Sequence, residues 1–211
     1  MPAAPAAVVL ALLALLLLPR AMLDAQAPST LVGYTVRDRA IVATSIGAGP
    51  AEVILIGGLH AGSESNTVAL ADQLLAYFSA RPHELPAEVT LTIVPAVNLD
   101  GLVAGTRANA NGVDLNRNWP TDDWAPFALH GEEIVSGGAG PGSEPEVASL
   151  HNFLLQRDPA LVVSFHSVAL VVQSNGVGLA AGYAMAYAAD DGYQFIPDWP
   201  FYPITGEQNV A

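Results

Sequence analysis

The sequence contains no cysteine and no lysine. The missing cysteines exclude a disulfide framework, a thiolate nucleophile and any cysteine-ligated zinc or iron–sulfur site, so a bound metal ion must rest on His, Asp and Glu. The 7 basic residues are all arginine and stand against 20 acidic residues, which gives a formal net charge of -13. Because such a chain offers no basic stripe to a phosphate backbone, we expect no nucleic-acid partner and no binding to anionic membrane surfaces.

The length and composition favour one folded domain. A chain of 211 residues can bury a sizeable core but is short for two ordinary domains. Hydrophobic residues make up 52% of the chain, and its 19 glycines and 16 prolines fall below the share typical of low-complexity sequences. Intrinsic disorder is therefore excluded as the main state. The sequence does not indicate the oligomeric state.

The N-terminal residues have the character of an export signal. An unbroken apolar run covers residues 6–18, and Ala25-Gln26-Ala27 has the small-x-small form of a cleavage site. The run is shorter than the roughly 20 apolar residues of a membrane-spanning helix. We expect residues 1–27 to be a signal peptide, with an uncleaved N-terminal anchor as the alternative. The domain at 28–211 is then exported, either secreted or periplasmic.

Strand and helix patterns alternate along the chain. Amphipathic spacing predicts helices over 67–80 and 146–155, and Ser143 with Glu146 predicts a capping box for the second of them. Apolar runs between turns predict strands at residues 31–36, 40–46, 53–56, 90–97 and 161–165. This order predicts an α/β fold: a three-layer α/β/α sandwich whose central sheet is mixed and largely parallel.

Two histidines follow predicted strands. His60 comes after the strand at 53–56 and His166 directly after the strand at 161–165, while Glu64 lies four residues beyond His60. Ligand sites of such sheets lie beyond the carboxyl ends of the strands. Two imidazoles and one carboxylate are the ligand composition of a catalytic zinc site with one open position. The alternative is that both histidines are hydrogen-bonded loop residues and Glu64 a helix-start acid.

Two arginines lie close together in sequence near the middle of the chain. Arg117 follows Asn116 in the stretch Gly112-Val113-Asp114-Leu115-Asn116-Arg117-Asn118-Trp119, and Arg107 lies shortly before it. Guanidinium groups grip carboxylates through parallel hydrogen bonds, so these residues are candidates for binding a substrate carboxylate. A buried structural cluster of ion pairs with Asp114 is the alternative.

With this stretch the sequence resembles the zinc metallocarboxypeptidase family, the carboxypeptidase A-like peptidases. The resemblance runs from near Val32 to Gly206. Its most specific motif is GVDLNRNW, and four further motifs follow the family's order around it: Gly57-Gly58-Leu59-His60, Ser143-Glu144-Pro145-Glu146, Ser164-Phe165-His166-Ser167 and Tyr202-Pro203-Ile204-Thr205-Gly206. The resemblance implies the α/β/α sandwich of that family.

The resemblance also implies a metal centre. By it, His60, Glu64 and His166 bind one zinc ion per chain, and Asp114 accepts a hydrogen bond from the far nitrogen of His60. The family's usual spacing is His-x-x-Glu, whereas Ser63 stands at that third place here. Serine is a poor zinc ligand, so Glu64 is the expected one, with Gly62 giving the loop the freedom to absorb the extra residue.

Four further roles follow from the resemblance. Asn116 and Arg117 would bind the terminal carboxylate of a peptide, and Arg107 would stabilise the oxyanion as zinc-bound water attacks the scissile carbonyl. Tyr202 would close over the bound C-terminal residue, although a packing role for this aromatic side chain is the alternative. The partner implied is a peptide with a free C-terminal carboxylate.

The family's general base does not match a residue of this sequence. By resemblance it is a Glu on a later strand, and Glu207 is too close to Tyr202 to be that residue. We therefore expect a chain incomplete at its C-terminus, as from a truncated gene. Three functional hypotheses remain: a zinc metallocarboxypeptidase, a cell-wall peptide amidase of the same superfamily, and a non-catalytic domain that binds zinc and peptide carboxylates.

Overall fold

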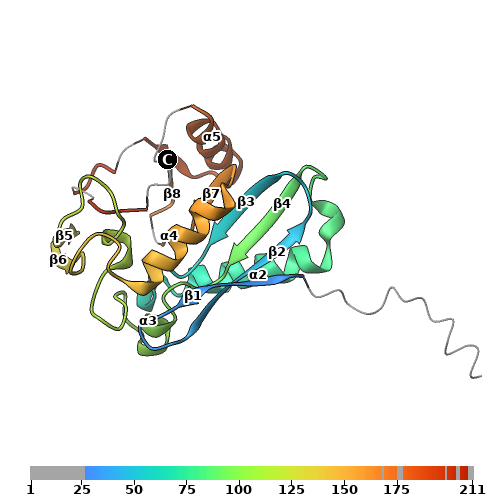
Figure 1. Cartoon of the computed structure of the whole chain (residues 1–211). Coiled ribbons are helices and arrows are strands. Elements are labelled where there is room, and N and C mark those ends of the chain that lie inside the picture. Colours follow the sequence, from blue (N-terminus) through green and yellow to red (C-terminus); the bar gives the residue numbers. More distant parts are fainter. Residues whose placement is uncertain (1–26, 168, 175–177, 198, 203–204, 209–211) are drawn as a thin grey trace, which may run out of the picture.

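The computed structural model describes residues 27–167, 169–174, 178–197, 199–202 and 205–208. The expected leader thus lies outside the described residues, apart from Ala27. Within the part described, no helix combines the length and the apolar character needed to cross a membrane. A twisted sheet with helices on both sides makes up most of this part (Figure 1).

Five strands form the central sheet in the order β1-β2-β4-β3-β7. β1 and β4 both pair antiparallel with β2, whereas β4 and β7 both pair parallel with β3. The mixed sheet predicted from the alternating pattern is confirmed. The strands are β1 (Ser29–Tyr34), β2 (Ala40–Gly47), β3 (Ala51–Ile56), β4 (Val89–Val94) and β7 (Leu161–Ser164).

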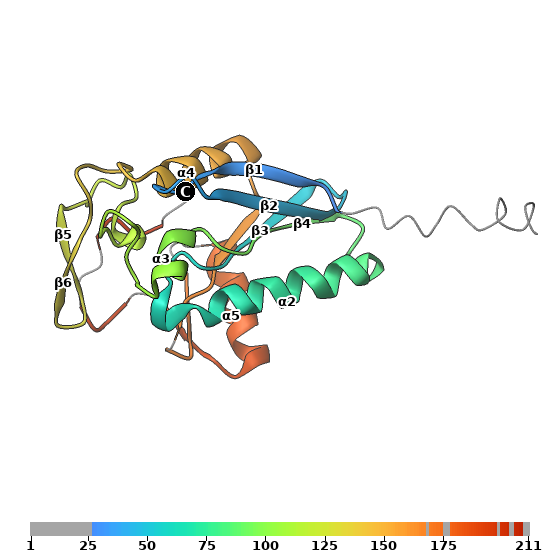
Figure 2. The same cartoon turned by 90° about the horizontal axis from the view of Figure 1, so that it is seen from below.

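Helices cover both faces of the sheet. Figure 2 shows α2 (Asn66–Ala80) on one side and α4 (Pro145–Arg157) on the other. Side chains alternate along a strand, so neighbouring residues of β3 face different helices. Ile54 and Ile56 pack in the core cluster that contains Leu150, while Val53 and Leu55 pack in the cluster that contains Ala71. This three-layer arrangement was also predicted.

One strand end and one helix cap were predicted wrongly. The strand predicted at 90–97 ends at Val94, because Pro95 has no backbone N–H to continue a ladder. The capping box does not form: α4 begins at Pro145, its N-cap residue is Glu144, and no side chain caps it. Proline is favoured at the first position of a helix, so Pro145 fixes the start there. Glu146 is fully buried and accepts the backbone N–H of Val36.

Several elements were not predicted. One is a short helix, α3 (Leu99–Ala104), and the Asn98 side chain caps it by accepting from the nitrogen of Gly101 at 2.8 Å. The others are β5 (Phe127–His130), β6 (Glu133–Ser136), β8 (Val171–Gln173), α5 (Leu179–Asp191), β9 (Gln194–Ile196) and the 3-10 turns η2 (Gly62–Glu64), η3 (Pro82–Glu84) and η4 (Leu115–Arg117). β5 and β6 form an antiparallel hairpin.

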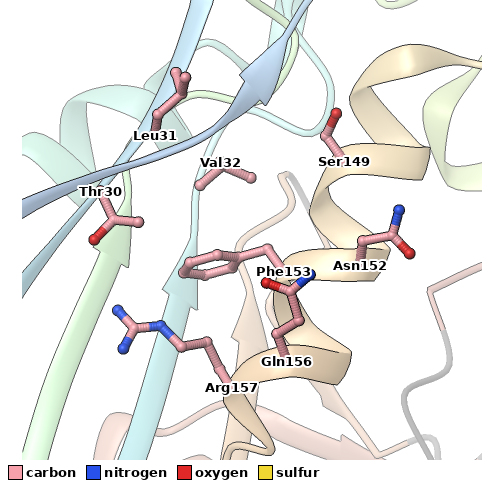
Figure 3. Close-up of a pocket in the computed structure, with 8 residues that line it drawn as sticks. All are labelled: Thr30, Leu31, Val32, Ser149, Asn152, Phe153, Gln156 and Arg157. Carbon is pink, nitrogen blue, oxygen red and sulfur yellow. The ribbon is translucent and has the colours of Figure 1, made fainter.

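A cavity of about 280 Å³ lies between β1 and α4. The strand and the helix touch at Gly33, where an added Cβ would lie 2.2 Å from Oγ of Ser149, and the cavity opens beyond this contact. Phe153 projects from α4 between Val32 and Arg157 (Figure 3). Arg157 itself lies 3.8 Å from Glu52 at the start of β3, so the cavity is far from the end of the strand that precedes His60.

Candidate active site

The pairing of β3 with β7 brings the two predicted histidine ligands together. Ile56 pairs with Ser164, and each strand then runs out of the sheet toward its histidine. As a result, Nδ1 of His60 lies 3.2 Å from Nδ1 of His166, although 106 residues separate them. His60 is buried, whereas the side chain of His166 is 38% exposed. One ring is thus fixed in the interior and the other borders solvent.

Glu64 completes the cluster from η2. Gly62 begins this turn with a left-handed φ of +64°, a conformation that favours glycine, and the turn carries Glu64 back over His60. One Glu64 oxygen lies 3.2 Å from Nδ1 of His60 and the other lies 3.3 Å from Nδ1 of His166. The expected loop adjustment at Gly62 is confirmed. Both histidines hold the pKa of Glu64 well below its usual range, against the opposing effect of burial.

The three side chains fit a tetrahedral metal ion. Their candidate ligand atoms lie within 4.8 Å of one another, and the shortest separation for each pair is 3.2 or 3.3 Å. Two ligands at the zinc bond lengths of about 2.0–2.2 Å and at a tetrahedral angle lie about 3.3–3.5 Å apart. The donor set, two imidazole nitrogens and one carboxylate, is also that of known catalytic zinc sites. These residues therefore suit zinc.

Asp114 lies behind His60. One of its oxygens accepts from Nε2 of His60 at 2.8 Å, which leaves Nδ1 as the nitrogen that faces Glu64 and His166. This arrangement fixes the tautomer in which Nδ1 can bind a metal. Burial opposes ionisation of Asp114, but His60 and the charges of Arg107 and Arg117 hold its pKa well below the usual range. Asp114 is therefore a carboxylate at neutral pH.

Arg107 lies directly against the cluster. Its Nε donates to Asp114 at 2.9 Å, its Nη1 donates to Glu64, and its Nη2 lies 2.9 Å from Nε2 of His60. The guanidinium thus balances two buried carboxylates and remains 21% exposed. A positive charge that both borders solvent and touches the candidate ligands can stabilise negative charge that develops on a bound carbonyl.

Asn116 and Arg117 are only partly directed to the cluster. The backbone nitrogen of Asn116 donates to Asp114 at 2.9 Å, and its side-chain oxygen accepts from the nitrogen of Gln208 at 3.0 Å. Arg117 is 2% exposed, and its guanidinium donates to the carbonyls of Asn116 and Leu129 at 2.6 and 3.2 Å. Its Nε has no hydrogen-bond partner among the described residues. Carboxylate binding by this pair stays a prediction.

Tyr202 packs within a group of aromatic rings. Its ring centre lies 5.7 Å from that of Trp199 and 6.2 Å from that of His130, edge to face in both cases. Tyr202 is half-buried. Its closure over a bound substrate stays a prediction. His130 is itself half-buried. No spacing motif singles out this histidine.

The loop that carries Asp114 is held from behind by buried amides. Asn118 donates to the carbonyls of Gly137 and Gly140 at 2.7 and 3.0 Å. The Asn109 side chain donates to Glu144 at 2.7 Å and to Glu146 at 3.1 Å. Burial, together with the charge of Glu144, raises the pKa of Glu146. This network ties the candidate site to the start of α4.

A sequence profile described as zinc carboxypeptidase matches residues 24–179. The chain belongs to the zinc carboxypeptidase family. The match includes His60, Glu64 and His166, the three candidate metal ligands. The family resemblance stated from the GVDLNRNW stretch is thereby confirmed.

Within the zinc carboxypeptidase family, the chain is similar to murein peptide amidases. It is 32% identical over 156 residues to murein peptide amidase A of Escherichia coli K12, a match that covers 67% of this chain and 61% of the relative. The enzyme of the same name from Vibrio campbellii is 34% identical over 123 residues, with 54% and 46% covered. The chain thus matches less than two thirds of the length of these relatives.

Solved structures of zinc carboxypeptidase relatives share the fold. Murein-tripeptide amidase MpaA from Escherichia coli O157 superimposes with a TM-score of 0.68 at 26% identity, over 90% of this chain and 80% of that one. Carboxypeptidase A from Helicoverpa armigera gives a TM-score of 0.66 at 20% identity, over 86% and 55%. The second likeness concerns the fold alone.

Replacing Asp114 by asparagine should weaken zinc binding by about 10- to 100-fold. The amide keeps the size of the side chain but removes the charge that holds Nε2 of His60 protonated and Nδ1 free. The measurement is a competition titration against a chromophoric zinc chelator. Asp122→Asn, which changes an exposed acid, is the control. Equal affinities for Asp114→Asn and Asp122→Asn would show that Asp114 does not support the metal centre.

Proposed function

We propose that the protein is a zinc-dependent amidase that acts on cell-wall peptides. The observation that carries this proposal is the cluster of His60, Glu64 and His166, in a chain 32% identical over 156 residues to a murein peptide amidase. One zinc ion per chain would be held by these three side chains. Bound zinc lowers the pKa of a water molecule and polarises a carbonyl, which is the chemistry that amide hydrolysis needs.

The chain's own residues would orient a ligand, stabilise charge and bind the substrate, and none of them is assigned as the general base. Asp114 keeps His60 in its metal-binding tautomer through the 2.8 Å hydrogen bond. Arg107 brings a partly exposed positive charge to the place where the carbonyl oxygen becomes negative. Asn116 and Arg117, next in sequence to the Asp114 loop, would bind a carboxylate of the substrate, and Tyr202 would cover it.

The second candidate is a metallocarboxypeptidase that removes the C-terminal residue of ordinary peptides. Family membership supports it, as does the Asn116-Arg117 pair beside the metal cluster. The cell-wall assignment is preferred because the relatives with more than 30% identity are murein peptide amidases.

We further propose that the domain works outside the cytoplasm, where a cell-wall substrate would lie. The apolar run at 6–18 and the Ala25-Gln26-Ala27 sequence support export. N-terminal sequencing of the chain from a secreted or periplasmic fraction tests this. A first residue of Pro28 is expected, and an intact Met1 in the cytoplasmic fraction contradicts it.

The decisive experiment compares two substrates on zinc-loaded protein. One is a murein tripeptide with a γ-linked D-glutamyl bond, and the other is an all-L peptide with the same C-terminal charge. Faster cleavage of the murein peptide is expected. Preferential cleavage of the all-L peptide would favour the carboxypeptidase. Zinc and peptide binding without turnover of either substrate would favour the non-catalytic alternative.

A further inference from the structure

The β5–β6 hairpin is bonded to the loop that carries Asp114. The nitrogen of Asp114 donates to the carbonyl of Ser136 at 3.0 Å, and Val113 forms a β-bridge with Ser136. At the other strand, Arg117 donates to the carbonyl of Leu129 at 3.2 Å. Figure 1 shows the hairpin at the end of the molecule beside the last part of the described chain. The hairpin therefore packs against the loop that carries Asp114 and Arg117.

Side-chain alternation gives this hairpin two different faces. Phe127, Leu129 and Ile134 share the face that is exposed, at 67%, 38% and 75%. His130, which pairs with Glu133, belongs to the opposite face together with Ala128 and Val135. His130 is half-buried, and its ring meets Tyr202 edge to face at 6.2 Å.

The charges that act on His130 are those of the candidate active site. Burial lowers the pKa of its imidazole, and the positive charges of Arg107, His60 and Arg117 lower it further, against the opposing charge of Asp114. At neutral pH the ring is then a neutral group with one N–H donor and one acceptor. Its N–H can therefore donate to an oxygen acceptor of a ligand, such as a carbonyl or carboxylate group.

We propose that His130 is a further substrate-contacting residue, which donates a hydrogen bond to a carbonyl or carboxylate oxygen of the bound peptide. This inference rests on the proposed function, since the ligand is the peptide. Tyr202 packs against the ring edge to face. His130 would contact the peptide from the hairpin, whereas the candidate metal ligands follow β3 and β7.

Two variants separate hydrogen bonding from packing. His130→Phe keeps a ring against Tyr202 but removes the donor, and it should weaken binding of the murein tripeptide to zinc-loaded protein by about 3- to 10-fold. His130→Gln retains a donor and should recover part of that affinity. His83→Phe, at an exposed position in η3, is the matched control and should bind as the unchanged protein does. Isothermal titration calorimetry gives the affinities.

The NMR signals of the imidazole nitrogens provide a second measurement, which a role of His130 in packing alone would leave unchanged on peptide binding. The chain has 5 histidines, so single substitutions suffice to assign their ring nitrogens. Adding the tripeptide should shift the ring nitrogen signals of His130 and leave those of His83 in place. If the peptide is bound and cleaved while His130→Phe keeps full affinity and the His130 signals stay unchanged, the inference is wrong and the proposed function stands. If the peptide neither binds nor is cleaved, both fail.

Discussion

His166→Ala should abolish stoichiometric zinc binding. The substitution removes one of the three candidate ligands found among the described residues, so the loss of affinity should exceed the roughly 10- to 100-fold cost of changing a residue behind a ligand. When zinc binding is lost, hydrolysis of the murein tripeptide should fall to the background rate. The measurement is zinc per chain by plasma mass spectrometry after dialysis against buffer without metal, with one zinc per chain expected for the unchanged protein.

The His166 side chain is 38% exposed, so its removal leaves the core intact and the variant should remain folded. Circular dichroism checks this. His83→Ala, which changes a histidine outside the cluster, is the matched control and should retain one zinc per chain. Retention of stoichiometric zinc by His166→Ala would show that the metal lies elsewhere and would remove the basis of the proposed function.

Trp119→Ala should have the largest effect on stability. The indole is fully buried in the cluster under α4, packs edge to face on His151 at 6.0 Å, and ends the loop that carries Asp114 and Arg117. Removing a buried tryptophan costs about 3–5 kcal/mol, against a typical net stability of about 5–15 kcal/mol. Urea unfolding followed by circular dichroism measures the loss. Zinc affinity should fall too, because the Asp114 loop loses its anchor.

Phe127→Ala is the control for Trp119→Ala. Phe127 belongs to the same region of the chain but is 67% exposed, so its truncation should change the free energy of unfolding by less than about 0.5 kcal/mol. For both variants, the slope of the free energy of unfolding against urea concentration should equal that of the unchanged protein. Similar midpoints for both variants would mean that Trp119 does not anchor the loop.

The predictions that were confirmed depend on local sequence patterns. The apolar run at 53–56 and the position of His60 after it depend on neighbours along the chain, and the site follows because parallel strands end at one edge. The extra residue before Glu64 could be placed because Gly62 allows the left-handed turn. The error at Ser143 has a local cause as well: Pro145 takes the first helical position, which makes Glu144 the N-cap residue.

Contacts between distant segments could not be predicted in the same way. His130 stands in a short hairpin without a motif, and its ring contacts Tyr202, 72 residues later. The bond from Arg117 to Leu129, which holds this hairpin, is equally a matter of the folded chain. The orientation of the Arg117 side chain likewise depends on tertiary contacts. The sequence shows a guanidinium beside Asn116, but only the packed hairpin shows that its donors turn to backbone carbonyls.

The pairing of β7 with β3 also determines the order in which the site can assemble during folding. His60 and Glu64 are close in sequence, so η2 can place them together once β3 is formed. His166 arrives only after a loop of 106 residues closes, at an entropic cost on the order of 4 kcal/mol. The last ligand is therefore the slowest to dock. An ion bound by all three would cross-link β3 to β7 and oppose local opening at that strand.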